Sequence, residues 1–212
     1  MKNMKQKEFE KELPSGYRQV FYLNAKSIRV GLVLNLIAFA VLVAVMAVAL
    51  IPLIRADRLK DVIWSISENL IAFLVFYAAI FVYIVLHELT HGIVYKSLTG
   101  EKLTFGMSWS CAFCGVPHIY VKRRVSLIAS AAPLLVFSVI MLPLTVLLYF
   151  VDPLYYLLSA LVFGLHLGGC GGDIYIILLM LFRYRNPETL VRDTGPEQTV
   201  YVPIADSESE EE

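Results

Sequence analysis

Residues 69–95 read NLIAFLVFYAAIFVYIVLHELTHGIVY, and Glu88 is the only Asp, Glu, Lys or Arg among them. A helix of roughly 20 apolar residues crosses a hydrocarbon core of about 30 Å, so this segment is long enough to span a membrane. Inside a membrane the backbone must satisfy its own hydrogen bonds, which a single segment of this length achieves as an α-helix. The sequence therefore predicts a transmembrane helix here.

Three further segments have the same character. Residues 30–54 and 125–151 contain no charged side chain, and residues 153–182 contain only Asp173. With 58% hydrophobic and 17% charged residues, the chain is too apolar for a water-soluble domain. We predict an all-α membrane protein with four transmembrane helices. Segment 30–54 could instead be a signal peptide, because Ala47-Val48-Ala49 resembles a cleavage site, but its apolar run is too long and begins too late.

The basic residues predict the orientation of these helices. Of the 18 Lys and Arg residues, 15 lie in residues 1–29, 95–124 and 183–212, which four helices would place on one side. Basic residues near helix ends remain in the cytoplasm, so we expect a multi-pass protein of the plasma membrane with both termini cytoplasmic. Residues 30–182 form the membrane domain, residues 1–29 a cytoplasmic segment, and residues 183–212 an acidic tail whose composition predicts disorder.

The loop at residues 95–124 contains an alternating pattern of apolar and small or polar side chains. A period of two is typical of a strand with one apolar face. We predict a turn over residues 114–117 and a return strand over 118–121, and hence a short interfacial β-hairpin over 104–121, between the second and third helices. The alternating apolar residues are Phe105, Met107, Trp109, Cys111 and Phe113.

The second predicted helix contains His87-Glu88-Leu89-Thr90-His91, an H-E-x-x-H motif. Residues four apart face the same way on a helix, so both imidazoles can reach one zinc ion while Glu88 projects beside the metal. An uncompensated charge within a membrane costs about 2.5–3.5 kcal/mol on insertion scales. The alternative, polar residues that only pack the helix bundle, gives no reason for that cost.

A zinc site of this kind needs a third protein ligand. Asp173 is the only charged residue of the fourth predicted helix and follows a glycine-rich segment at residues 168–172, which would let a neighbouring helix approach closely. At about 1.5 Å per residue, His87, His91 and Asp173 all lie roughly 8 to 15 Å inside the cytoplasmic boundary. We predict that these three residues bind Zn²⁺. The alternative for Asp173 is a structural hydrogen bond between helices.

Two other groups of residues leave alternatives open. His166 lies about 10 Å deeper than Asp173 on the same helix face, and could contact the substrate or transition state or be a structural histidine. Cys111, Cys114 and His118 could form a second metal site or a redox pair, but they offer only three ligands. Because Cys111 falls on the apolar face of the predicted strand, packing is the favoured interpretation.

The motifs together resemble the bacterial putative zincin peptidases of the membrane. The similarity also includes Ala131-Ala132-Pro133 at the start of the third helix, Gly172-Asp173 in the fourth, and residues 13–18 (LPSGYR) near the N-terminus. A more distant similarity is to the site-2 proteases, which use two His, one Asp and a catalytic Glu. The resemblance implies that His87, His91 and Asp173 bind zinc and that Glu88 is the catalytic base.

These observations predict a zinc metalloprotease that hydrolyses peptide bonds in or at the membrane, near its cytoplasmic side, with a metal-activated water. Its partners would be the lipid bilayer and a membrane-protein or peptide substrate, and the formal net charge of zero argues against nucleic acid. One alternative is a non-hydrolytic metal-binding membrane protein, a regulator or transport component, although metal binding alone does not require Glu88. A purely structural four-helix module leaves Glu88 and Asp173 without a role.

Overall fold

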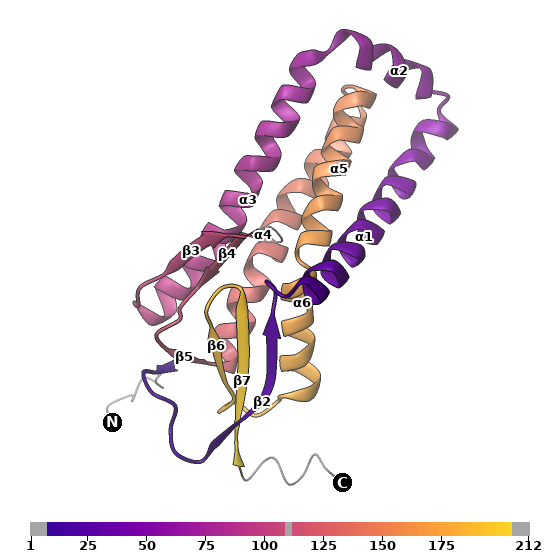
Figure 1. The fold of residues 1–212 in the computed structure, drawn as a ribbon. Coiled ribbons are helices and arrows are strands. Elements are labelled where there is room, and N and C mark those ends of the chain that lie inside the picture. Colours follow the sequence, from indigo (N-terminus) through magenta and orange to yellow (C-terminus); the bar gives the residue numbers. More distant parts are fainter. Residues whose placement is uncertain (1–7, 109–111, 205–212) are drawn as a thin grey trace, which may run out of the picture. The chain divides into compact units, whose positions relative to one another are not determined.

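Four long apolar helices dominate the computed structural model, which describes residues 8–108 and 112–204 (Figure 1). By length and composition each of them is able to cross a membrane, which makes the chain a multi-pass membrane protein and confirms the predicted fold class. Their bounds agree with the predicted segments to within a few residues. They are α1 (Ile28–Arg55), α3 (Leu70–Thr99), α4 (Arg123–Tyr149) and a fourth span over Pro153–Arg183.

The fourth span is interrupted rather than continuous. Helix α5 (Pro153–Gly169) begins after the N-cap Asp152, whose carboxylate accepts hydrogen bonds from the backbone N–H groups of Leu154 and Tyr155. It ends at Cys170, and α6 (Gly171–Leu178) follows directly and continues as a π-helix over Leu179–Arg183. Glycine is the most conformationally permissive residue and a poor helix former, which accounts for a break in this glycine-rich segment.

The structure divides into two compact units, and unit 2 comprises residues 33–87 and 133–172. It includes the short helix α2 (Leu59–Glu68), in a segment for which the sequence analysis predicted no element. Its α1 and α5 approach closely, because a methyl group at Gly168 would lie 2.7 Å from the carbonyl oxygen of Ala38. The predicted role of a small residue at a helix contact is confirmed there. The buried core of unit 2 contains Ala49, Leu53, Val62, Tyr156 and Ala160.

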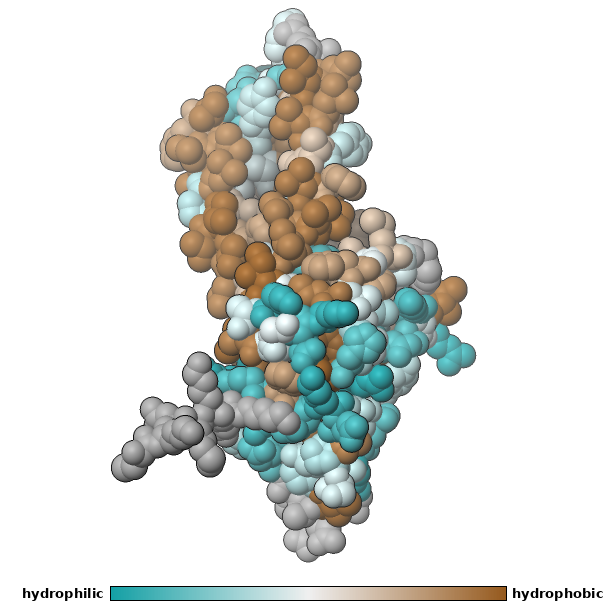
Figure 2. Space-filling model, turned by 90° about the vertical axis from the view of Figure 1, so that its left-hand side faces the viewer, coloured by the Kyte–Doolittle hydropathy of each residue, from teal (hydrophilic) through white to brown (hydrophobic). Residues whose placement is uncertain are grey.

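Large apolar side chains cover the outer faces of the long helices (Figure 2). In water such a surface would be unfavourable at about 25 cal/mol for each Å², whereas lipid accommodates it. Examples with exposed fractions of 60% or more are Phe39, Val48, Ile71, Tyr77, Phe81 and Val139.

Unit 1 comprises residues 1–32, 88–132 and 173–212 and contains a five-stranded sheet that the sequence analysis did not predict. All of its strand pairs are antiparallel, in the order β1-β5-β6-β7-β2. A buried cluster that includes Val121, Ile176, Val191 and Val200 forms the core of this unit. The strands are β1 (Phe9–Glu10), β2 (Tyr17–Asn24), β5 (Tyr120–Lys122), β6 (Leu190–Asp193) and β7 (Glu197–Pro203).

The expectation of a disordered tail over 183–212 is therefore wrong for residues 190–203. These residues form the β6–β7 hairpin, which pairs with β5 on one side and β2 on the other. A turn at Asp193-Thr194-Gly195-Pro196 joins its strands, and Gly195 has a φ of +99° that favours glycine. The β-branched apolar residues on both sides of this turn are typical of strands. The acidic composition of the tail obscured this pattern. Residues 205–212 lie outside the described residues.

The predicted hairpin between the second and third long helices is present, with a different second strand. Strand β3 (Thr104–Met107) pairs with β4 (Ala112–Gly115) in a separate two-stranded sheet. The expected return strand at 118–121 instead overlaps β5 of the larger sheet. The turn was predicted too late in the sequence, because Gly115 belongs to β4. The backbone of Gly115 packs against Gly195 too closely for any side chain. The predicted positions Trp109 and Cys111 lie outside the described residues.

The sheet of unit 1 also bears on membrane topology. Strand β2 precedes the first long helix, β5 lies between the second and third, and β6 and β7 follow the fourth. In Figure 1, β2, β6 and β7 run side by side. Segments hydrogen-bonded in one small sheet occupy the same side of a membrane, so the strands near both termini share a side. The count of basic residues is an independent observation, and it places the same segments on one side.

Candidate metal centre

Helix α3 carries three of the four residues that we predicted for the site. His87, Glu88 and His91 follow one another within its last four turns. Because α3 is helical throughout this stretch, His87 and His91 project from the same face one turn apart. His87 is 8% exposed, and Glu88 and His91 are partly buried.

In unit 1 the structure brings His91 together with Asp173. The Nε2 atom of His91 lies 3.5 Å from Oδ1 of Asp173, and both side chains are about seven-eighths buried. The Nδ1 atom of His91 lies 2.9 Å from the carbonyl oxygen of Ala129. A carbonyl only accepts hydrogen bonds, so Nδ1 must carry a hydrogen. In the neutral ring, Nε2 is then a lone-pair donor directed at a carboxylate oxygen.

Two acceptor atoms at this distance need a cation between them, either a proton on Nε2 or a metal ion. In tetrahedral zinc sites, bonds of about 2.0–2.2 Å to N and O ligands separate two ligand atoms by about 3.4 Å. The observed 3.5 Å between His91 Nε2 and Asp173 Oδ1 matches that separation. A backbone carbonyl that fixes the tautomer of a ligand histidine is also typical of metal sites. The residues of unit 1 therefore fit two ligands of one zinc ion.

Asp173 owes its place to the interruption of the fourth span. It lies in the first turn of α6, three residues after the break at Cys170. The first turn of a helix favours a carboxylate, because the backbone N–H groups there have no partner within the helix. The sequence suggested Asp173 because it is the only charged residue of the fourth span, follows the glycine-rich segment and lies at a matching depth, whereas the structure adds its position at a helix start.

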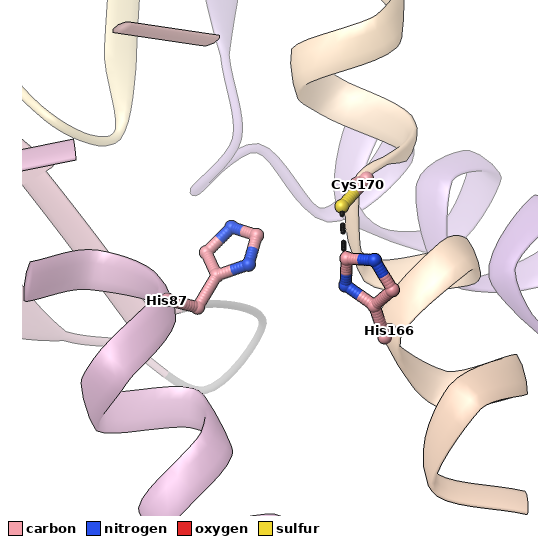
Figure 3. Close-up of side chains that lie close together, drawn as sticks. All are labelled: His87, His166 and Cys170. Carbon is pink, nitrogen blue, oxygen red and sulfur yellow. Dashed lines mark hydrogen bonds between the residues drawn. The ribbon is translucent and has the colours of Figure 1, made fainter. Parts of the chain in front are cut away.

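In unit 2, His87 lies beside His166 and Cys170 (Figure 3). The hydroxyl of Tyr83 is 3.0 Å from Nδ1 of His87 and 3.0 Å from Nδ1 of His166. The Nε2 atom of His166 lies 3.0 Å from Oγ of Ser138. His166 is completely buried, and both of its ring nitrogens have hydrogen-bond partners. This favours the structural alternative for His166 over contact with a substrate.

The group of Cys111, Cys114 and His118 is described only in part. Cys114 is buried in β4, whereas His118 is exposed and Cys111 lies outside the described ranges. Burial, together with the nearby carboxylates of Glu88 and Asp193, raises the pKa of the Cys114 thiol to about 12. A thiol with so high a pKa is a poor nucleophile and metal ligand, which supports packing as its role.

The β3–β4 hairpin packs directly beside the motif. A methyl group at Gly92, the residue after His91, would lie 2.8 Å from the Phe105 ring of β3 and 3.3 Å from Cys114 Sγ of β4. A side chain at this position would have to displace the Phe105 ring. The sequence analysis predicted the hairpin at the membrane surface. It did not predict that the hairpin contacts the helix turn that carries His91.

Asp193 is a buried carboxylate that the sequence analysis missed. It accepts hydrogen bonds from the hydroxyl of Tyr95 at 2.6 Å and the backbone N–H of Gly195 at 2.8 Å. Burial raises the pKa of Asp193 to about 6, and these hydrogen bonds oppose the shift. Tyr95 lies one turn after His91 on α3. The carboxyl-terminal hairpin is thereby joined to the helix of the motif.

The family assignment rests on residues 80–187, which match the family described as putative zincin peptidase. The matched region is just over half of the chain and contains His87, Glu88, His91 and Asp173. The chain belongs to this family. Its membership confirms the predicted resemblance to the putative zincin peptidases and supports a metallopeptidase that uses zinc. Neither the curated proteins nor the solved structures contain a significant match to the chain.

Proposed function

We propose that this zincin-family protein is a zinc-dependent peptidase that cleaves membrane-protein or peptide substrates within the membrane or at its surface. The observation that carries the proposal is the pair His91 and Asp173, two buried ligand atoms 3.5 Å apart. His87 supplies the third ligand from the preceding turn of α3. Two neutral imidazoles and one carboxylate leave zinc with a net charge of about +1, which is easier to bury than the bare ion.

Glu88 is the general base of the proposed reaction. When bound, zinc supplies Lewis-acid activation of a water molecule and of the scissile carbonyl. The Glu88 carboxylate accepts a proton from the attacking water and then delivers it to the nitrogen of the leaving amine, so that one peptide bond breaks as water adds. The side chain is only half-buried, which allows water to reach it. Glu88 favours a peptidase over a non-hydrolytic metal-binding protein, because metal binding alone does not need this carboxylate.

The β3–β4 hairpin suggests how a substrate could bind. A peptide bond in a helix is shielded by its own hydrogen bonds, so a helical substrate must unwind before cleavage. Strand β3 pairs with β4 and has no second partner among the described strands. An extended substrate segment could pair with the open edge of β3 by β-augmentation. Phe105 and Met107 of β3 are 50% and 74% exposed and could contact its side chains.

The zinc content of the purified protein tests this proposal directly. We expect one zinc ion per chain by elemental analysis after purification without chelator. Zinc-free protein that binds none on reconstitution would contradict both the peptidase and the metal-binding alternative, and would favour a structural module.

The second expected result concerns topology. We propose that the shared side of the sheet is the cytoplasm and that the membrane is the plasma membrane, because 15 of the 18 basic residues flank that side. Reporter fusions after residue 212 and before residue 1 should both report the cytoplasm, whereas a fusion between α1 and α3 should report the opposite side. A carboxyl terminus outside the cell would place the Glu88 chemistry near the opposite face.

A further inference from the structure

Unit 2 contains a buried chain of hydrogen bonds that ends at His87. It runs from Nδ1 of His87 to the hydroxyl of Tyr83, from there to Nδ1 of His166, and from Nε2 of His166 to Oγ of Ser138. Each of these three distances is 3.0 Å. Tyr83 precedes His87 by one turn of α3, whereas His166 lies on α5 and Ser138 on α4. The chain therefore connects three helices of this unit.

Aromatic packing holds these rings in place. The ring of Phe137 is stacked against His87 at an interplanar angle of 15°, and meets Tyr83 edge-on at a centroid distance of 5.3 Å. It also contacts His166 edge-on at 6.0 Å. Tyr83, His87, Phe137 and His166 are each at most 8% exposed. Buried rings in contact on several sides keep one rotamer, so the hydrogen-bond chain is preorganised.

The positions of the hydrogens follow from counting donors. A tyrosine hydroxyl has one hydrogen, yet the Tyr83 oxygen lies within hydrogen-bond distance of two Nδ1 atoms. When both rings are neutral, Tyr83 donates to one Nδ1 and accepts from the other. The chain therefore has two possible directions. In one, His87 donates from Nδ1 and its Nε2 has a lone pair; in the other, His87 carries its hydrogen on Nε2.

Only the first direction allows His87 to bind a metal through Nε2, the atom that His91 also presents. We propose that Tyr83 and His166 are positioning residues that fix the metal-binding tautomer of His87; the inference rests on the proposed zinc role of His87. Tyr83 accepts the hydrogen of His87 Nδ1 and donates to Nδ1 of His166, which donates from Nε2 to Ser138. The hydrogen-bond partner of His87 Nδ1 is thus the Tyr83 hydroxyl, whereas that of His91 Nδ1 is the Ala129 carbonyl.

The same cluster could also be considered as a metal site, because ligand atoms of His87, His166 and Cys170 lie within 4.8 Å of one another. The hydrogen bonds favour the positioning role instead. Both Nδ1 atoms already contact the Tyr83 hydroxyl, and Cys170 Sγ lies 3.7 Å from Nδ1 of His166, a weak contact. Zinc content distinguishes the two possibilities.

The tautomers are measurable because the chain has only four histidines. We expect ¹⁵N NMR of the zinc-free, histidine-labelled protein, recorded with the His87 and His166 rings neutral, to show His87 with hydrogen on Nδ1. His166 should carry hydrogen on Nε2. Single His→Gln variants assign the four signals. Hydrogen on Nε2 of His87 would overturn the inference without the need for any tyrosine variant.

The matching variant is Tyr83→Phe, which keeps the ring and removes the hydroxyl. Loss of a residue that orients a metal ligand typically weakens metal affinity by 10–100-fold, so we expect a loss of that size in zinc competition with a chelator. Tyr77→Phe is the control, because Tyr77 lies on the same helix and is 66% exposed. Its zinc affinity should equal that of the wild type.

Three results would overturn the positioning role. Equal zinc affinity of Tyr83→Phe and wild type would remove Tyr83 from the metal site and leave the proposed peptidase intact. Two zinc ions per wild-type chain, falling to one in Cys170→Ser, would make the cluster a second metal site. A wild-type protein that binds no zinc would overturn this inference and the proposed function together.

Discussion

Replacing Glu88 by glutamine is expected to abolish proteolysis while zinc remains bound. Glutamine keeps the size of the side chain and one oxygen, but cannot accept a proton from water at neutral pH. The proposed zinc ligands His87, His91 and Asp173 are unchanged. Loss of general-base assistance typically costs about 10²–10⁴-fold in rate. The measurement is cleavage of a membrane-protein substrate, identified by comparing proteomes with and without the enzyme, beside elemental analysis of the same variant.

Glu101→Gln is the matched control for this experiment. Glu101 follows α3 and lies near Lys11, with 3.6 Å between Oε1 and Nζ, so the variant removes one carboxylate from the same region without touching the proposed site. A single ion pair at the protein surface contributes little to stability, and we expect unchanged cleavage. Undiminished cleavage by zinc-loaded Glu88→Gln would show that Glu88 is not the base. The expectation holds for any substrate, because every amide hydrolysis needs this proton transfer.

The long helices could be predicted because their signal is local and strong. Residues 30–54 and 125–151 contain no charge at all. In lipid, a single segment of this kind satisfies its backbone hydrogen bonds only as a helix. The spacing of His87 and His91 likewise fixes their relative position as soon as the segment is helical. Asp173 could be proposed because so few charged residues lie within the spans. In each case the prediction depends on a property of neighbouring residues.

The sheet of unit 1 could not be predicted in the same way, because its pairs join distant segments. Val121 of β5 pairs with Val191 of β6, and Tyr17 of β2 with Pro203 of β7. Short strands of two to eight residues carry a weak periodic signal, and the acidic end of the chain concealed the two near the carboxyl terminus. The shared role of Tyr83 and His166 was equally hidden, since it arises from packing between helices.

Replacing Asp173 by alanine is expected to remove most of the zinc from the purified protein. Alanine leaves His87 and His91 in place but deletes the carboxylate oxygen that lies 3.5 Å from His91 Nε2, together with the negative charge that offsets the buried cation. Removal of a residue that only orients a metal ligand typically lowers metal affinity by roughly 10–100-fold. Removal of a ligand itself should lower the affinity by more than this. Elemental analysis and chelator competition measure both the occupancy and the affinity.

The control is Asp152→Ala, which removes the acidic residue directly before the fourth span. Asp152 caps α5 at its start, so this variant should lose about 1 kcal/mol of stability and keep its zinc. A fall in zinc in both variants would indicate unfolding rather than ligand loss, and a thermal melt separates the two. Full zinc occupancy in Asp173→Ala would move the third ligand elsewhere, with His166 first and Cys170 second, because both lie beside His87. The tautomer argued for His166 would then fail as well, since a metal would replace the Tyr83 hydroxyl at its Nδ1.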